Sequence, residues 1–247
     1  MSTRVIAVFC VAASVFLLVS CKSWQKSWQA LDSSFYPEKV ELDKDPGWPE
    51  SEVEAAHVFA QVDQGLQRLL LELELQETLP DQGWAENVLQ GQPWLQGLLV
   101  VDKEGEIQQG NKARDLPEGV VQEVLSRAET WQDDDLRLVL PHKGEQTWMV
   151  LARPYQQGRQ WQGLILAYFQ PQAMLKKADN PDQIILLSKE QVLWDGDYPQ
   201  AANKALEQDW SGHLQDEAYG QIRVADQEFY WLSRYVGQDP IFYLLAK

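Results

Sequence analysis

The chain has 247 residues, a formal net charge of −16 and 45% hydrophobic residues, among them eleven tryptophans. This composition indicates a folded, well-packed body and excludes a largely disordered chain. The negative charge also argues against nucleic acid as a partner, because phosphates require a basic surface.

The N-terminal residues are typical of an export segment. Arg4 precedes an uncharged apolar run at residues 5–19. The run is shorter than the about 20 residues of a membrane-spanning helix, but it suits the core of a signal peptide. Leu18-Val19-Ser20-Cys21 follows and resembles the lipobox of bacterial lipoproteins, which implies cleavage before Cys21 and a lipid on its sulfur. An ordinary signal peptide or a short anchor helix is the alternative.

These features predict how the N-terminal part is organised. Residues 1–20 would be a lipoprotein signal peptide and residues 21–49 a polar, proline-containing lipidated tether that holds the protein in the cell envelope. In enterobacterial lipoproteins, a residue other than Asp after the cysteine directs export to the outer membrane. Lys22 fits that rule, so we expect an outer-membrane location facing the periplasm. Cys10 lies in the removed segment, which leaves the folded body without cysteine chemistry.

A long amphipathic helix is predicted next, at residues 50–78 within a helical region at 50–82. Ser51 is the expected N-cap and Pro80 the expected stop. Apolar residues recur at helical spacing along one face, namely Val58, Val62, Leu66, Leu69 and Leu73.

The rest of the chain repeats one order of elements. In a first module, residues 83–178, we expect a helix at 83–90, a strand–turn–strand at 94–107, a helix at 116–130 and strands at 136–140, 147–155 and 161–169. In a second module, residues 179–247, we expect strands at 183–187 and 191–194, a helix at 200–210 and strands at 220–224, 228–236 and 241–246. Leu151-Ala152-Arg153 matches Leu232-Ser233-Arg234. The pattern predicts an α+β protein with two five-stranded antiparallel sheets.

This order resembles the Cache superfamily, the extracytoplasmic relatives of PAS domains, and in particular its double-Cache sensors. The most recognisable stretch is Leu98-Leu99-Val100-Val101-Asp102-Lys103-Glu104-Gly105, the strand and Asp-x-x-Gly turn that open such modules. The resemblance implies a long N-terminal helix followed by two tandem PAS/Cache-like modules.

Two departures limit what the resemblance implies. Double-Cache receptors usually lie between two membrane helices, whereas no second apolar span is seen here, so any signal is expected to pass through a partner. The amine-binding pattern is also absent. The most similar segment is Arg159-Gln160-Trp161, with Gln162 where Tyr would be expected. Amino-acid binding is therefore not inferred from the resemblance.

Motifs for catalysis or metal binding are weak. His57, His142 and His213 are far apart and lack metal-ligand spacing. Asp133-Asp134-Asp135 and Asp195-Gly196-Asp197 contain calcium-type oxygens, but solvated loops and turns are the favoured interpretation. No phosphate loop or nucleophile elbow is present. We therefore expect no metal, no cofactor and no enzymatic activity.

A binding pocket is the better hypothesis. In PAS-like modules the ligand lies between the sheet and the helices. By that resemblance the candidates are Trp131, Trp148, Arg153, Tyr155 and Tyr168. Aromatic walls and one cation would suit a small carboxylate or an aromatic solute. Strand alternation places Arg153 and Tyr155 on one face and Trp148 on the other. Alternatively, the tryptophans are core residues and Arg153 is exposed or paired.

The leading functional hypothesis is a non-enzymatic, lipid-anchored binding or sensory accessory protein of the cell envelope. It would capture a small solute or present its modules to an envelope signalling or assembly protein. The alternative is a structural or assembly lipoprotein with degenerate pockets, in which the last strand of each module offers an edge for β-augmentation. An envelope enzyme with an unrecognised site is a third interpretation. A polar-lined cavity would favour the first and a solidly packed interior the second.

Overall fold

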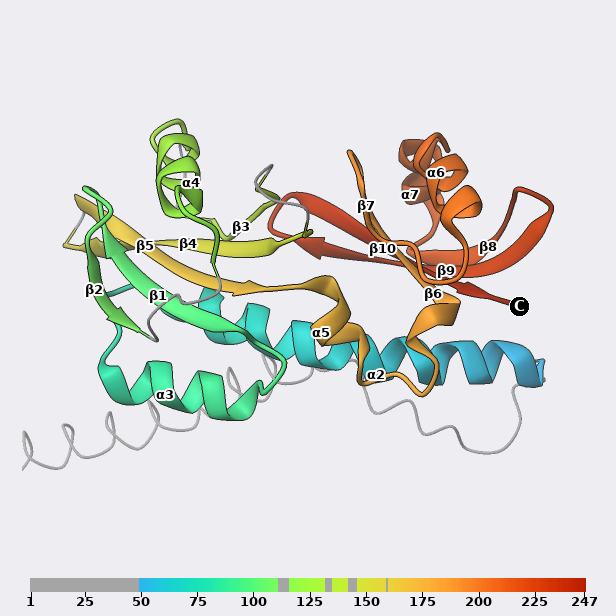
Figure 1. Ribbon diagram of the computed structural model, residues 1–247, viewed down its shortest axis with the longest axis horizontal. Helices are drawn as coiled ribbons and strands as arrows, with labels where there is room; N and C mark the ends of the chain where they lie inside the picture. Colours follow the sequence, from blue (N-terminus) through green and yellow to red (C-terminus); the bar gives the residue numbers. More distant parts are fainter. Residues whose placement is uncertain (1–48, 111–115, 132–134, 142–145, 159) are drawn as a thin grey trace, which may run out of the picture. The chain divides into compact units, whose positions relative to one another are not determined.

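The computed structural model describes residues 49–110, 116–131, 135–141, 146–158 and 160–247 (Figure 1). The predicted signal peptide, Cys21 and the tether lie outside these residues. The described residues form the unit Pro49–Lys247. Within this unit, no helix is both long enough and apolar enough to cross a membrane.

Helix α2 (Glu50–Glu74) confirms the predicted amphipathic helix. Its apolar stripe is fully buried at Val62, Leu66, Leu69 and Leu73. The helix ends before residue 78, because the apolar side chains beyond Leu73 no longer meet a partner surface: Leu75 is 75% exposed.

The predicted N-cap of this helix is wrong. Pro49 occupies the N-cap position and no side chain caps the helix. The Ser51 hydroxyl instead forms a 2.8 Å hydrogen bond with the hydroxyl of Tyr230 in the second sheet. The Ser51 side chain therefore forms a tertiary contact and does not cap the helix.

The first module contains one antiparallel sheet of order β2-β1-β5-β4-β3. Strand β1 is buried along Gly97 to Val101 and pairs with β5 through Leu99↔Leu166. The helices of this module are α3 (Gln82–Gly91), α4 (Val120–Ala128) and α5 (Pro171–Leu175). Its strands are β1 (Gly97–Asp102), β2 (Ile107–Gly110), β3 (Arg137–Val139), β4 (Met149–Gln157) and β5 (Gln160–Phe169).

The second module repeats this topology with the order β7-β6-β10-β9-β8. The repeated strand order confirms the predicted pair of five-stranded antiparallel sheets. The helices are η1 (Pro181–Gln183), α6 (Pro199–Leu206) and α7 (Trp210–Asp216). The strands are β6 (Ile184–Ser188), β7 (Val192–Trp194), β8 (Tyr219–Val224), β9 (Gln227–Val236) and β10 (Asp239–Ala246).

The helix expected at residues 200–210 is two helices. Helix α6 ends at Leu206 and α7 begins at Trp210. The Asp209 carboxylate caps α7 by accepting a hydrogen bond from the Gly212 backbone N–H at 3.1 Å. The break turns Trp210 into the core, where it is 5% exposed and stacks on Phe242. Burial of this indole decides where the helix is interrupted.

The expectation that the last strand of each module is a free edge is wrong. Strands β5 and β10 lie in the middle of their sheets, and the edges are β2, β3, β7 and β8. The burial of the strands explains their positions. Six consecutive residues of β10 are buried, whereas β2 is mostly exposed. Strands that are apolar on both faces occupy central positions.

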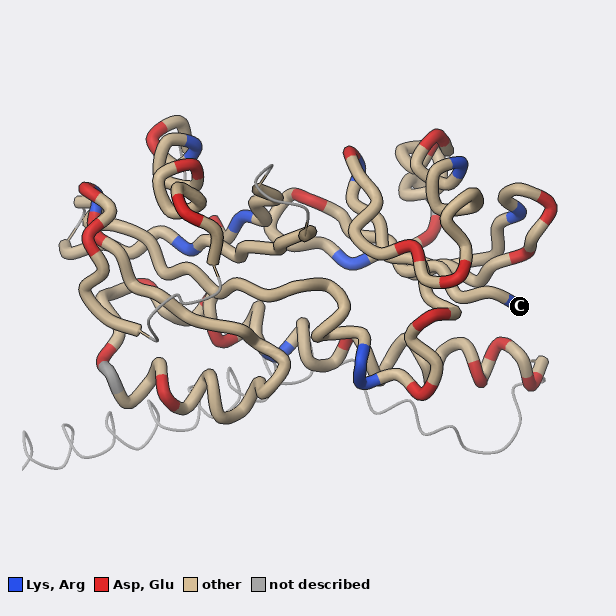
Figure 2. Tube along the Cα trace, in the orientation of Figure 1, with Lys and Arg blue, Asp and Glu red and all other residues tan. Residues whose placement is uncertain are grey.

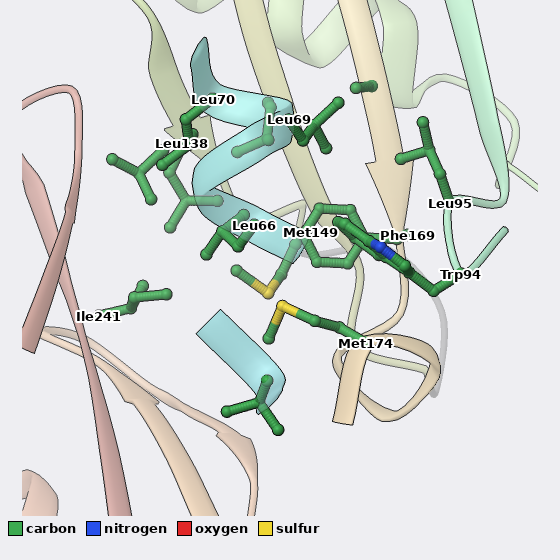
Figure 3. Close-up of a cluster of buried hydrophobic side chains, with 14 of the residues drawn as sticks. Leu66, Leu69, Leu70, Trp94, Leu95, Leu138, Met149, Phe169, Met174 and Ile241 are labelled. Atoms are coloured by element: carbon green, nitrogen blue, oxygen red, sulfur yellow. The ribbon is translucent and has the colours of Figure 1, made fainter. Parts of the chain in front are cut away.

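Helices cover both faces of each sheet. Helix α4 covers one face of the first sheet, α6 and α7 cover one face of the second, and α2 with α3 lies on the opposite side (Figure 1). The largest core forms along α2 and includes side chains from both sheets (Figure 3). In it, Trp94 meets Phe169 edge-on with ring centroids 4.7 Å apart. Two further cores lie beneath α4 and beneath α6–α7.

Candidate functional site

Three of the five predicted pocket residues come together beneath α4. Trp148 and Tyr168 are 2% and 1% exposed, and their ring centroids are 6.0 Å apart. Trp131, after the end of α4, packs against the same cluster while partly buried. Tyr168 lies on β5, and Trp148 directly precedes β4, whose residue Val150 pairs with Tyr168.

The other two predicted residues lie on the opposite face, as strand alternation predicted. Tyr155 is 5% exposed and belongs to the core along α2. Burial raises its pKa, and the nearby Asp102 carboxylate raises it further. The Arg153 guanidinium donates a 3.5 Å hydrogen bond to the Glu74 carbonyl oxygen. A cation there complements the negative end of the α2 dipole. The five residues therefore cannot line one cavity.

The space beneath α4 offers little to an ionised solute. The side chains that face α4 from the sheet include Leu99, Val101, Val150 and Leu166, all with no exposed surface. Among the described residues, the one buried charged side chain is Asp63, which lies on α2. An ionised ligand buried without a counter-charge would be strongly unfavourable.

The corresponding space in the second module is also filled by aromatic rings. Trp210 stacks on Phe242 with centroids 4.3 Å apart and meets Trp231 edge-on at 5.6 Å. Its indole N–H donates to the Ala205 carbonyl oxygen at 2.8 Å. Sequence reasoning placed no candidate in this module. The clustering of aromatic residues in the predicted strands 228–236 and 241–246 was the signal that could have suggested this core.

An ion pair between the buried Asp63 and the partly buried Arg234 joins α2 to the second sheet. The Arg234 Nε donates to both Asp63 carboxylate oxygens at 3.0 and 3.1 Å, and a second guanidinium nitrogen also donates to Asp63. These bonds raise the pKa of Arg234 against the opposing effect of burial. The Tyr243 ring is fully buried, and burial raises its pKa well above its usual value, with a further contribution from Asp63.

Two cavities among the described residues lie away from the predicted pocket. One, of about 510 Å³, is lined by α2, by the segment before β6 and by the end of β10. The other, of about 400 Å³, is lined by Gln146, Gln170, Trp194 and their neighbours. Neither cavity is lined by any of the five predicted residues, so neither was predicted from the sequence.

No group of three His, Cys, Asp or Glu side chains in the described part of the chain is placed to hold a metal ion. Asp195-Gly196-Asp197 forms the turn that was favoured from the sequence. The Asp197 N–H donates to the Asp182 carbonyl oxygen at 2.8 Å, and Gly196 has a φ of +53°. Asp133 and Asp134 lie outside the described residues.

Among the comparisons with known proteins, the one with solved structures bears on the fold. No protein-family model and no curated protein matches the chain. A solved structure of "Methyl-accepting Chemotaxis protein X" matches with a TM-score of 0.50 and 11% identity, over 79% of this chain and 96% of that one. This likeness shows the fold: an α+β arrangement of a long helix and two tandem PAS/Cache-like modules.

Further solved structures have similar scores. The ligand-binding domain of the amino acid chemoreceptor PctB of Pseudomonas aeruginosa PAO1, in complex with L-Gln, matches with a TM-score of 0.47 and 16% identity over 78% of this chain and 88% of its own. An extracellular ligand binding receptor from Desulfohalobium retbaense matches with a TM-score of 0.46 and 16% identity over 78% of this chain. The chain spans 38% of that receptor's length.

Proposed function

We propose that this chain is a lipid-anchored accessory protein of the cell envelope, which captures a small solute or presents its modules to an envelope partner and catalyses no reaction. The observation that carries the proposal is a two-module Cache-like fold that follows a sequence resembling a lipobox at Leu18-Val19-Ser20-Cys21.

The lipid anchor is tested by metabolic labelling with a clickable fatty acid in a bacterial host. We expect the wild-type protein to be labelled and to sediment with membranes, and Cys21→Ala to lose the label. Unlabelled wild-type protein would overturn the anchor. Lys22 supports an outer-membrane location, so Lys22→Asp in an enterobacterial host is expected to move the protein to the inner-membrane fraction. An unchanged distribution would contradict this location.

Solute capture is tested by a thermal-shift screen of the full-length protein in detergent against amino acids, organic acids, amines and nucleobases. A ligand that binds the native state stabilises it by about 2.7 kcal/mol at one hundred times its dissociation constant. We expect at least one saturable shift. A shift that is lost in Arg153→Ala or Tyr155→Ala would place the ligand at the first sheet.

A second function, assembly or scaffolding through protein contacts, is favoured by the filled interiors. Trp148 and Tyr168 fill the first module beneath α4, and Trp210, Trp231 and Phe242 fill the second beneath α6 and α7. A flat screen on well-folded protein would favour this function. The sheet edges left for a partner strand are then β2, β3, β7 and β8.

A further inference from the structure

A cleft of about 510 Å³ lies between the first turns of α2 and the second sheet, and its lining reaches Tyr198, the residue before α6. One wall comes from the first turns of α2 and the other from the segment that leads into β6. Its volume lies within the range of small-molecule sites. The residues that line it include Ser51, Glu54, Ala55, His57, Asp179, Asn180, Gln183, Tyr198, Tyr230, Leu245 and Lys247.

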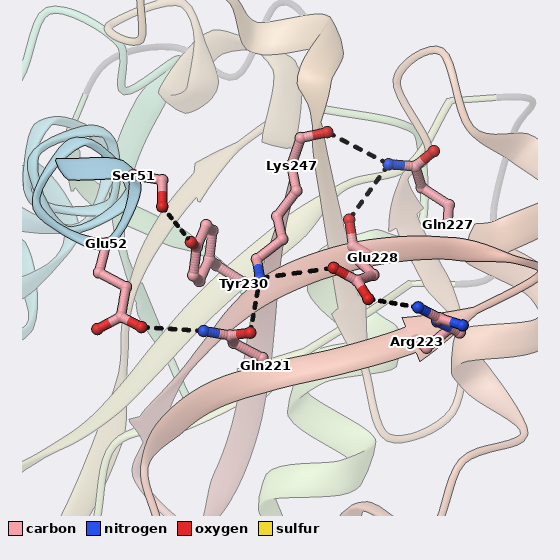
Figure 4. A network of polar contacts seen from close by, with 8 residues as sticks. All are labelled: Ser51, Glu52, Gln221, Arg223, Gln227, Glu228, Tyr230 and Lys247. Atoms are coloured by element: carbon pink, nitrogen blue, oxygen red, sulfur yellow. Dashed lines mark hydrogen bonds and ion pairs between the residues drawn. The ribbon is translucent and has the colours of Figure 1, made fainter. Parts of the chain in front are cut away.

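The floor of the cleft contains an aromatic ring that is held in position. Tyr230, on β9, is 8% exposed, and its hydroxyl is hydrogen-bonded to the Ser51 hydroxyl at 2.8 Å (Figure 4). The ring already accepts one ammonium, since the Lys247 Nζ lies 4.6 Å from its centroid. The electron-rich face of a tyrosine ring attracts such cations. A ligand ammonium that displaces Lys247, or that reaches the ring beside it, would meet the same attraction.

The ionised groups of the cleft favour a positive ligand. Glu54 on α2 and Asp179 before β6 supply one carboxylate from each wall. The Lys247 ammonium is balanced by groups outside the lining, because it donates to the Gln221 side-chain oxygen at 2.6 Å and lies 3.6 Å from Glu228 (Figure 4).

The surroundings of the cleft reinforce this preference. Acidic residues also occupy the first turn of α2 (Figure 2). A chain with a net charge of −16 attracts cations from a distance.

We propose that this cleft binds a small organic ammonium compound, with its cationic head near Tyr230 and between the carboxylates of Glu54 and Asp179. The inference deepens the solute-binding role proposed above, on which it rests, and assigns it to a site that contains none of the five residues predicted from the sequence. Leu245 and Ala55, 7% and 3% exposed, would cover the apolar part of the ligand.

The test is isothermal titration calorimetry of the full-length protein in detergent with choline and putrescine. The controls are their uncharged counterparts, 3,3-dimethylbutan-1-ol and 1,4-butanediol, and the anion succinate. We expect saturable binding of at least one ammonium compound and none of its uncharged counterpart. Equal binding of the charged and uncharged members of a pair, binding of succinate alone, or no binding of either amine would overturn the proposal.

Variants locate the site. Glu54→Gln and Asp179→Asn are each expected to weaken amine binding by about fivefold or more, because each removes one carboxylate from the wall. Lys247→Gln is expected to tighten it, because a like charge leaves the lining. Glu207→Gln, the same charge change at an exposed residue after α6, should bind as wild type. Unchanged affinity in both carboxylate variants would overturn the proposal.

The two proposals can fail separately. If the solute screen gives a shift with another class of compound that Glu54→Gln leaves unchanged, the cleft proposal is wrong and solute binding stands. If the amines and the whole screen give no signal on folded protein, both proposals are wrong.

Discussion

Asp63 on α2 forms a bidentate ion pair with Arg234 on β9, and this pair fixes the long helix against the second sheet. Asp63 is 3% exposed and lies on the apolar side of the helix, between Val62 and Leu66. A buried carboxylate is strongly unfavourable without a partner, so the position of α2 is tied to this arginine. Since α2 also packs against the first sheet, the pair specifies how the helix joins the two modules.

Removal of Arg234 should destabilise the protein. We expect Arg234→Met to lower the free energy of unfolding by about 2–3 kcal/mol, because it leaves the buried Asp63 carboxylate without a counter-charge. The partial exposure of Arg234, and the hydrogen bond that the Gln67 amide donates to Asp63 at 2.7 Å, keep the loss below the about 3–5 kcal/mol of fully buried pairs. Urea denaturation followed by circular dichroism measures the change. The double variant Asp63→Leu/Arg234→Met should recover much of the loss.

The control for this prediction is the exposed pair formed by Arg223 and Glu228. Arg223→Met removes the same kind of charge from a solvent-screened site and should change stability little. An Arg234→Met variant as stable as Arg223→Met would show that the buried pair does not hold α2.

Tyr243 should make the protein lose stability at alkaline pH. An unfolded tyrosine loses its proton near pH 10, whereas burial raises the folded pKa well above that value. The stability that this group contributes is therefore complete below about pH 10 and falls as the pH rises through the folded pKa. Unfolding free energies at pH 8 to 11 should fall less steeply in Tyr243→Phe than in wild type. The same fall in unfolding free energy with pH in both proteins would contradict this prediction.

Much of the fold was predictable because burial and sequence pattern agree. The apolar stripe of Val62, Leu66 and Leu69 determines α2, and the continuous apolar runs of β1 and β6 mark them as buried strands. The same reasoning failed for the sheet edges, because the strand order within a sheet depends on pairings between distant segments. The sequence alone does not show which strands pair, so β5 and β10 could not be recognised as central strands.

The candidate site was harder to predict for a related reason. Alternation along β4 correctly separated Arg153 and Tyr155 from Trp148. Asp63 was missed, although an acid within an apolar helical stripe is a signal for a buried partner. The cleft is formed by residues distant in sequence, such as Ser51 and Tyr230, which come together only after folding.

Gly97 is required by the ring of Tyr168. The two residues face each other between β1 and β5, and a Cβ added at Gly97 would lie 2.0 Å from the tyrosine hydroxyl oxygen. Gly97→Ala is therefore expected to destabilise the fold by about 1–3 kcal/mol through overpacking. In the double variant with Tyr168→Leu the two effects should be less than additive. Gly91→Ala is the matched control, because a Cβ there meets no atom within 4 Å.

Trp148 fills space beneath α4 and is 2% exposed. Trp148→Ala should lower the free energy of unfolding by about 3–5 kcal/mol and leave an apolar cavity, whereas Trp161→Ala should cost less because Trp161 is only partly buried. Apolar cavities of this kind bind small aromatic molecules. Indole should therefore raise the melting temperature of Trp148→Ala and leave that of Trp161→Ala unchanged. A shift confined to Trp148→Ala would indicate that the first module has the architecture of a ligand pocket that its own tryptophan fills. Equal behaviour of the two variants would indicate that the core collapses around the lost ring and holds no such pocket.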